Sequence, residues 1–420
     1  MAHDVSRALM WLFTFSINIA QKNLEIPTRY NCTYTQKDIL RALTFLSLER
    51  EYAQDGLKRL TRKLRRAGKP KKSTMHRRKA KPPKIAAKKP RKRPKAPNGD
   101  TLLLRLKQIN RSKAQSMLSK LNRQILETAK RKGAFTKKAT LAIDLTFIPY
   151  YGKITRWVNG GKPKQGTSYF HVWATLRAVS PGRRFTIKAV PIKRGCLDAA
   201  SMAKTVKELL AEAKSLNLRV ELVLLDKGFC WREVIAQLEG SGYKFLVAAK
   251  RDKKVKEAIL DYFKTGKGQV RRFSRGKGEG KVTFNLSIHR FKKRKRKRVR
   301  NILELYGAFA TNLRFKEAVR VWERLPEYYR RRWGIETGYR VDGGFRAMTT
   351  SKDEKLRFIY YQYMVFLENV WTLHNMGEAK RQGIALGDVK KLSVTVNDFG
   401  EDIIHLLVTA CDSGPPWIAA

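Results

Sequence analysis

Short apolar runs alternate with amphipathic segments between residues 139 and 249, and this alternation restricts the fold more than any other feature of the sequence. The apolar runs are rich in Val, Leu, Ile and aromatic residues, as strands are, whereas the segments between them have helical spacing. We predict strands at 141–144, 169–179, 185–192, 219–225 and 243–248, and helices at 197–216 and 231–238. Such a pattern indicates an α/β fold, a mixed sheet flanked by helices.

The rest of the chain divides by composition. Residues 1–62 indicate a helical N-terminal region, which is either a DNA-binding module or a packing and dimerisation module. Residues 63–100 are dominated by Lys, Arg, Pro and Ala, which cannot bury a core, so we expect a basic linker that is disordered when free. Further along we predict a helical connector at 101–138, the first part of the core at 139–249, a β-rich insertion at 250–311, the second part of the core at 312–380 and a C-terminal tail at 381–420.

Two of these segments carry finer predictions. Within the insertion, strands are expected near 269–270, at 282–284 and at 302–305. In the second part of the core, helical spacing predicts helices at 315–340 and 353–375.

The charge of the chain indicates its partner. Lys and Arg number 91 and Asp and Glu number 35, a formal net charge of +56. A surface this basic repels itself unless a polyanion neutralises it, and nucleic acid is the polyanion that we expect. A ribosome-associated protein and a protein adapted to a lipid surface remain alternatives. The apolar stretch 8–20 is too short to cross a bilayer, so we expect no membrane partner. Four dispersed cysteines predict neither a zinc site nor disulfides, which favours the cytoplasm.

Three acids stand out by position. Asp144 and Asp226 each follow a predicted buried strand, and Glu336 lies in the predicted helix 315–340. Acids at the carboxyl ends of strands are exposed at the rim of a sheet, where α/β folds bind ligands. Three carboxylates supply the hard oxygen ligands that two Mg²⁺ ions need for phosphoryl transfer. Taken singly, a strand-end Asp is more often a turn former and a helical Glu more often half of an ion pair.

Three short motifs around these acids resemble a known family. The run Asp144-Leu145-Thr146 is similar to the first block, D-x-T/S, of insertion-sequence transposases with an RNase H-like core. The run 226–229 resembles their second block, an Asp followed by Gly and an aromatic residue. The third block is the YREK signature, Y-x2-R-x3-E-x6-K/R, whose first three positions are matched by Tyr329, Arg332 and Glu336. On one α-helix these three would lie within about 60° of each other.

The resemblance fails at the last position of the signature. Gly343 stands where the family has a basic residue, and Arg340 or Arg346 is the candidate replacement. The interval between the second and third acids contains the predicted β-rich insertion, and this family has a β insertion there. Asp342, close to Glu336, is an alternative third ligand.

The resemblance implies a DDE-type transposase, which cuts DNA at the ends of a mobile element and transfers the freed strand to target DNA. It implies that Asp144, Asp226 and Glu336 bind two Mg²⁺ or Mn²⁺ ions. It also implies that Tyr329 and Arg332 contact DNA phosphates, although a core Tyr and an Arg332–Glu336 ion pair are the plain structural alternatives. The implied partners are double-stranded DNA of element ends and target, and a second copy on DNA, in a prokaryotic cytoplasm.

The sequence also bears on cofactors, on base stacking and on alternative functions. No nucleotide cofactor is expected, because Gly160-Gly161-Lys162 lacks the frame of a phosphate-binding loop. Trp157, Trp322 and Trp333 are candidates to stack on an unpaired base, with core packing as the commoner role. A metal-dependent nuclease without strand transfer, and a non-catalytic DNA-binding relic of a transposase, are the alternative functions.

Overall fold

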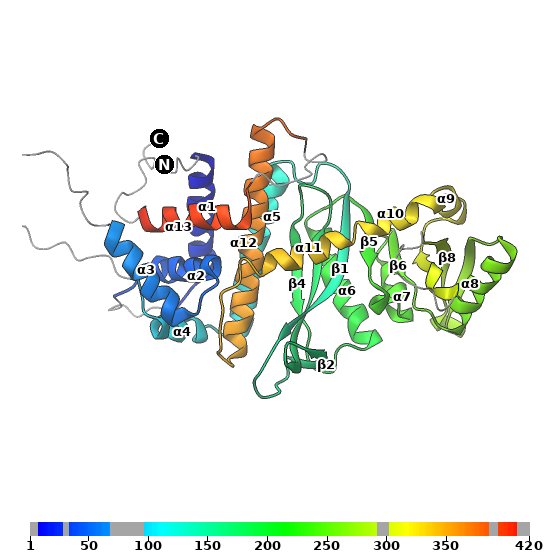
Figure 1. The fold of residues 1–420 in the computed structure, drawn as a ribbon, viewed down its shortest axis with the longest axis horizontal. Coiled ribbons are helices and arrows are strands. Elements are labelled where there is room, and N and C mark those ends of the chain that lie inside the picture. The colour runs from blue at the N-terminus through cyan, green and yellow to red at the C-terminus, as the bar shows by residue number, and fades with distance from the viewer. Residues whose placement is uncertain (1–6, 28–32, 68–95, 292–301, 386–393, 410–420) are drawn as a thin grey trace, which may run out of the picture. The chain divides into compact units, whose positions relative to one another are not determined.

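The computed structural model describes residues 7–27, 33–67, 96–291, 302–385 and 394–409. Most of the predicted basic linker, residues 68–95, lies outside the described residues. The chain forms two compact units, which we describe separately (Figure 1). Unit 1 comprises Met1–Leu121, Gly343–Met364 and Val394–Ala420, and unit 2 comprises Asn122–Asp342 and Val365–Ser393.

The described residues of unit 1 fold into helices. The helix α2 begins at the N-cap Thr35, whose side chain accepts a hydrogen bond from the backbone of Asp38 while the Asp38 carboxylate accepts one in return. Thr44 on α2 shares a buried hydrogen bond of 2.6 Å with Tyr363 of α12. The stretch predicted as a C-terminal tail contains a helix, α13. The helices with residues in this unit are α1 (Arg7–Asn23), α2 (Gln36–Glu49), α3 (Ala53–Ala67), α4 (Gly99–Lys107), α5 (Arg111–Arg131), α12 (Glu354–Arg381) and α13 (Val396–Thr409), with α5 and α12 continuing into unit 2.

A mixed sheet forms the centre of unit 2, and helices flank it, which confirms the predicted fold class (Figure 1). The strand order is β2-β3-β1-β5-β6-β9-β8-β7, with β4 also paired to β3. The strands β1, β5 and β6 are parallel, and the remaining pairs are antiparallel. The strands are β1 (Ala139–Pro149), β2 (Val158–Lys164), β3 (Thr167–Ala178), β4 (Thr186–Pro191), β5 (Val220–Leu225), β6 (Phe245–Ala248), β7 (Val270–Arg275), β8 (Val282–Arg290) and β9 (Tyr306–Thr311); the helices α6 (Ala199–Ser215), α7 (Arg232–Gly240) and α8 (Lys253–Thr265) connect them.

The predicted insertion is continuous with this sheet. It begins with a helix, α8, and its strands β7, β8 and β9 extend the sheet from β6, to which β9 pairs. The strand predicted at 302–305 is wrong, because these residues form a 3₁₀ turn and the strand begins at Tyr306. All six residues of β9 are buried, so tertiary packing decides where this strand lies.

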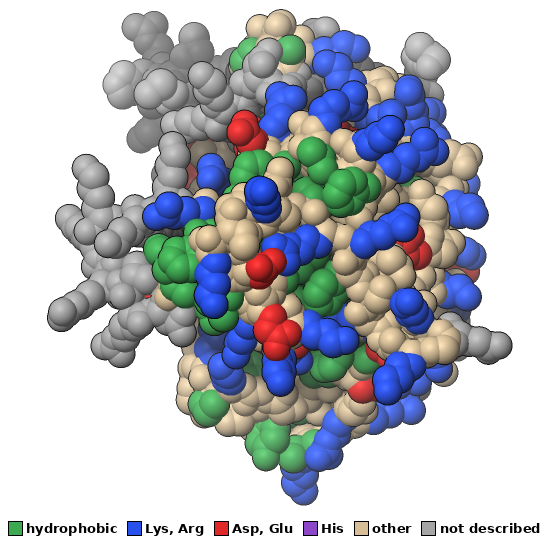
Figure 2. Space-filling model, turned by 90° about the vertical axis from the view of Figure 1, so that its right-hand side faces the viewer, with side chains coloured by type: hydrophobic (Ala, Val, Ile, Leu, Met, Phe, Trp, Pro, Cys, Tyr) green, Lys and Arg blue, Asp and Glu red, His purple; other side chains and the backbone are tan. Residues whose placement is uncertain are grey.

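Basic side chains dominate the face of the molecule shown in Figure 2, where Lys and Arg are far more numerous than Asp and Glu. This distribution is what the net charge of +56 requires. Among the described helices, none is both long enough and apolar enough to cross a membrane.

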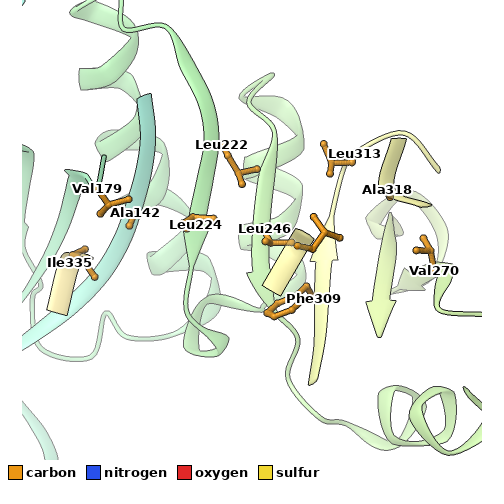
Figure 3. Packing of buried hydrophobic residues seen from close by; sticks show 11 residues of the cluster. Ala142, Val179, Leu222, Leu224, Leu246, Val270, Phe309, Leu313, Ala318 and Ile335 are labelled. Carbon is orange, nitrogen blue, oxygen red and sulfur yellow. The ribbon is translucent and has the colours of Figure 1, made fainter. Parts of the chain in front are cut away.

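An apolar cluster in unit 2 holds three short segments against the sheet (Figure 3). Ala142 of β1 and Leu224 of β5 contribute from the centre of the sheet, and Ile335 of α11 packs with them. Ile335 is fully buried, which contributes about 1.5–3 kcal/mol for a side chain of this size. The cluster therefore fixes the start of α11 close to the strand that carries Asp144. The segments are α9 (Phe315–Arg320), α10 (Leu325–Arg330) and α11 (Trp333–Asp342).

A buried charge network fixes the other end of α11. Arg177 of β3 donates to both carboxylate oxygens of Asp342 at 2.7 and 2.6 Å, and to Glu368 of α12 at 2.6 Å. Thr186 donates a further hydrogen bond to Glu368. Burial raises the pKa of the Glu368 carboxyl to about 8, against the opposing effect of the Arg177 guanidinium beside it. The side chains of Arg177, Asp342 and Glu368 are all at least nine-tenths buried, so loss of the Arg177 contacts would leave a buried guanidinium without its partners.

The network predicts a role for Gly338 on α11. A Cβ at this position would clash with Nη1 of Arg177, so Gly338→Ala should break the pairing of Arg177 with its carboxylates. We expect the free energy of unfolding to fall by about 3 kcal/mol, measured by urea denaturation. Gly377→Ala is the matched control, because Gly377 also lies in a helix but has open space around it. This control should be neutral or stabilising by up to about 1 kcal/mol. Equal losses in both variants would contradict the prediction.

Candidate active site

Two of the acids lie at the same level of the sheet, Asp144 on β1 and Asp226 directly after the neighbouring parallel strand β5. Ile143 of β1 pairs with Leu225, the last residue of β5, so Asp144 and Asp226 each follow a registered pair. The prediction that Asp144 ends its strand is wrong, because antiparallel pairing with β3 extends β1 as far as Pro149. The two carboxylates nevertheless meet at the rim of the sheet where β5 ends, the usual position of ligand sites in α/β folds.

The third motif lies on two helices with a turn between them. The continuous helix predicted for 315–340 is wrong, since α10 ends at Arg330 and α11 begins at Trp333. The link uses hydrogen bonds between residues three apart, from Arg332 N–H to Tyr329 at 3.0 Å and from Ile335 N–H to Arg332 at 2.9 Å, a tighter winding than that of an α-helix. Tertiary contacts, rather than one helical face, therefore bring the motif together.

Gly334 explains how this turn approaches the sheet. A Cβ on Gly334 would lie 3.1 Å from the Cβ of Val179, which is at the end of β3. A larger residue would push the turn away from the strand. The glycine thus permits the close packing that places the start of α11 against the sheet.

One guanidinium group connects the three acids. Nη1 of Arg332 lies 3.0 Å from Oδ2 of Asp144, and Nη2 lies 2.9 Å from Oε1 of Glu336 and 4.0 Å from Oδ1 of Asp226. The side chain of Arg332 is only 9% exposed, so these charges attract each other more strongly than on an open surface. The structure therefore brings Asp144, Asp226, Glu336 and Arg332 together in one charge cluster.

Tyr329 completes this cluster from α10. Its hydroxyl lies 3.4 Å from Oδ1 of Asp226, its ring lies 5.6 Å from the guanidinium carbon of Arg332, and its other neighbour is the ring of Phe309 at 4.8 Å. Burial raises the pKa of Tyr329 well above its usual range, so the hydroxyl stays protonated and can donate. The side chain packs in the core and reaches an acid at the same time.

The acids differ in their surroundings. Burial raises the pKa of Asp144 to about 6, against the opposing effects of the Leu145 N–H, which donates at 2.8 Å, and of Arg332. The side chains of Asp226 and Glu336 are 38% and 47% exposed. The cluster is thus a half-open site, with one acid deep against the sheet and two facing solvent.

The donor set suits a divalent cation in its chemistry. Within the described part of the chain, no group of three or more His, Cys, Asp or Glu side chains is arranged to hold a metal ion, and the three carboxylates instead surround Arg332. Carboxylate oxygens are nonetheless the hard ligands that Mg²⁺ and Mn²⁺ prefer, and the two exposed acids leave room for water ligands. The chemistry of the three carboxylates therefore suits such an ion, and in the structure the guanidinium of Arg332 supplies the positive charge between them.

Two other predicted residues lie outside the cluster. Arg340 is exposed on α11 one turn after Glu336, and none of the described ion pairs of the three acids involves it. Its role as the replacement for the missing basic residue stays a prediction. Asp342 is bound to Arg177 in the buried network, which argues against the alternative that it replaces Glu336 as a ligand.

A pocket of about 870 Å³ opens beside Asp226. Trp231 and Trp333 line it and are 37% and 55% exposed, and the ammonium group of Lys250 lies 4.6 Å from the ring centre of Trp231. Sequence reasoning missed Trp231 and Lys250. The only available signal was the position of Trp231, five residues after Asp226. Of the other tryptophans considered, Trp322 donates a hydrogen bond to a backbone carbonyl of β8 and stacks on a buried histidine, so it packs in the core.

Comparisons with known proteins agree with this geometry. A family model described as a transposase DDE domain matches residues 135–354, which is more than half of the chain and includes all three acids. Among solved structures, the chain is similar to a piggyBac transposase in a synaptic complex with hairpin DNA. The TM-score is 0.52 at 11% identity, with 96% of this chain and 80% of that chain covered, which indicates a shared fold. No curated protein sequence matches the chain. From the family match, the chain belongs to the transposases that carry a DDE domain.

Proposed function

We propose that this transposase cleaves DNA strands at the ends of a mobile element and joins the freed 3′-hydroxyl to target DNA, with divalent metal ions. The observation that carries the proposal is the convergence of Asp144, Asp226 and Glu336 on one guanidinium at the rim of the sheet. The basic surface and the family match support DNA as the substrate. Because two element ends must be held together, we propose that two copies act on the DNA.

Each residue of the cluster has a proposed role. Asp144, Asp226 and Glu336 would hold two Mg²⁺ or Mn²⁺ ions, which when bound supply positive charge beside the attacking and leaving oxygens. Arg332 would then offer its two parallel N–H groups to a DNA phosphate, a geometry that suits guanidinium. Tyr329 would donate one hydrogen bond from its protonated hydroxyl. The depth of Asp144 limits the motion of its carboxylate and so fixes one side of the site.

The pocket beside Asp226 favours an unpaired base next to the cut. Trp231 and Trp333 expose aromatic faces there, and stacking on such faces stabilises a base that has left the duplex. Lys250 and Arg330 line the same pocket and would bind the adjacent phosphates. The position of the pocket thus supports strand processing at a DNA end.

Substitution of one acid tests the proposal. Purified protein is mixed with labelled DNA that carries the repeats flanking its own gene, and Mg²⁺ is added. We expect Asp226→Asn to lower cutting and joining by more than about 100-fold, because an amide cannot replace the charge of a metal ligand. DNA binding should persist. The control is Glu208→Gln, which removes an exposed carboxylate of α6 that pairs with Lys188 at 3.3 Å, and it should keep full activity.

The products of this assay separate the alternatives. Cutting without joining to a second DNA would favour a metal-dependent nuclease on the same core. Tight binding without cutting, under any divalent cation, would favour a DNA-binding relic, and Gly343 would then be the first residue to examine. Wild-type cutting by Asp226→Asn would contradict the assignment of the acids.

Arg332 generates a second prediction, which concerns stability. In metal-free buffer, Arg332→Gln leaves three neighbouring carboxylates without their cation, so the free energy of unfolding should fall by about 1.5–3 kcal/mol. Added Mg²⁺ should raise the melting temperature of this variant more than that of the wild type, because the ion no longer competes with the guanidinium. Arg331→Gln is the control, since Arg331 is 42% exposed and pairs only loosely, at 3.7 Å, with Glu221. Equal melting of all three proteins without metal would refute the prediction.

A further inference from the structure

One stretch of the core is rich in cations and free of acids. From Leu145 to Leu197 the sequence contains ten Lys and Arg residues and no Asp or Glu, although the whole chain has 35 acids. Three of the ten have partners inside the fold: Arg177 in the buried network, Lys188 in ion pairs with Glu208 and Glu212 of α6, and Arg183 in a hydrogen bond to the carbonyl of Ala134. The proposed catalytic cluster uses none of the others.

The fold gathers three of these cations at the outer edge of β3. The backbone N–H of Arg194 donates to the carbonyl of Arg156 at 2.8 Å, and the side chain of Asn159 donates to the carbonyl of Ile192 at 3.0 Å. These two hydrogen bonds tie the segment after β4 to the start of β2. Arg156, Lys193 and Arg194 therefore lie on adjoining segments, and all three are exposed.

A tryptophan lies beneath two of the cations. The guanidinium carbon of Arg156 and the ammonium nitrogen of Lys193 are each 5.7 Å from the ring centre of Trp157, within the range of a cation–π contact. Trp157, one of the candidates for base stacking, thus lies against two cations of this stretch, and its stacking on a base stays a prediction. The ring of Trp157 holds the positive charges of Arg156 and Lys193 near each other.

Two more exposed lysines, Lys162 and Lys164, follow on β2 itself. We name the set of Arg156, Lys162, Lys164, Lys193 and Arg194 the β2 platform. Within the described residues, no member of the platform forms an ion pair with a carboxylate. A polyanion that binds here would therefore compete with none of the described carboxylates for these cations.

Strand register relates the platform to the acids. Val158 of β2 pairs with His171 of β3, and His171 pairs with Ile148 of β1, four residues beyond Asp144. The platform thus begins about 13 Å from Asp144 in the direction of the strands and about 10 Å from it across the strands. One turn of duplex DNA is about 34 Å long, so a duplex whose reacting phosphate lies at the acids has other phosphates within reach of the platform.

We propose that the β2 platform is a second DNA-binding surface, which holds the phosphate backbone of the duplex within one helical turn of the cut. The inference rests on the proposed function, since it needs a duplex at the acids. Five exposed cations that form no ion pair within the described residues suit the evenly charged backbone of a duplex, and each phosphate contact releases condensed counterions. The platform thereby binds without reading sequence.

Salt dependence of binding tests the platform without any cutting, in chelator and with wild-type protein as reference. The variant carries Arg156→Gln, Lys193→Gln and Arg194→Gln. We expect the plot of log affinity against log salt to become shallower by about 2–3, at about 0.9 per lost phosphate contact. The control carries Lys204→Gln, Lys207→Gln and Lys214→Gln, which removes the same charge from α6, a helix that also carries acids. This control should keep the wild-type slope.

Hydroxyl-radical footprinting locates the contacts. Wild-type protein should protect the backbone sugars within one turn of the cleavage site, and the platform variant should lose that protection while its melting temperature stays the same. The footprint is repeated on two DNAs, an element end that still carries its flanking DNA and an end that is already cut. The comparison shows whether the protected backbone belongs to the element or to the flanking DNA. The single change Lys193→Gln should make the slope shallower by about 0.9, the value of one phosphate contact. This variant keeps the test valid if the triple variant misfolds.

The outcomes that overturn the inference differ from those that overturn the function. A platform variant with the wild-type slope and footprint would refute the platform and leave the proposed function intact. A wild-type protein that neither binds nor cuts duplex DNA would refute the proposed function, and the platform with it.

Discussion

The candidate site depends on one electrostatic bridge, from Arg332 to three carboxylates. Two unit charges 4 Å apart interact with about 4 kcal/mol near a protein surface, so three acids on one rim would repel each other strongly without a cation. Burial adds to this cost at Asp144, whose pKa it raises. The guanidinium offsets both effects. Strand register places two of the acids, and the bridge allows them to stay close to Glu336.

The position of Glu336 is fixed from both ends of its short helix. Ile335 anchors the beginning of α11 in the apolar cluster, and Asp342 anchors its end through Arg177. Between these points, the hydroxyl of Tyr339 shares a hydrogen bond of 2.7 Å with Thr175, the residue that pairs with Asp144 across the sheet. Apolar burial and a buried ion network thus together stabilise α11, a helix that is too short to be stable alone.

The sequence predicted the mixed sheet, and it singled out acids that do meet in space. It predicted these because strand and helix periods are local properties. It missed the length of β1, which depends on pairing with β3, and the break before Trp333, which depends on the close approach of Gly334 to Val179. It also missed β2, since Gly160-Gly161 and the lysines around them lack the alternation of a half-buried strand. The roles of the site residues stay predictions.

The break between α10 and α11 divides the third motif between two helices. Tyr329 belongs to α10, Glu336 belongs to α11, and Arg332 lies in the link between them. The lining of the pocket beside Asp226 includes Pro326, Tyr329 and Arg330 of α10. The lining also includes Trp333 of α11 and Arg332 itself, so the pocket spans the break between the two helices. Whatever occupies the pocket therefore contacts the guanidinium that holds the three carboxylates together.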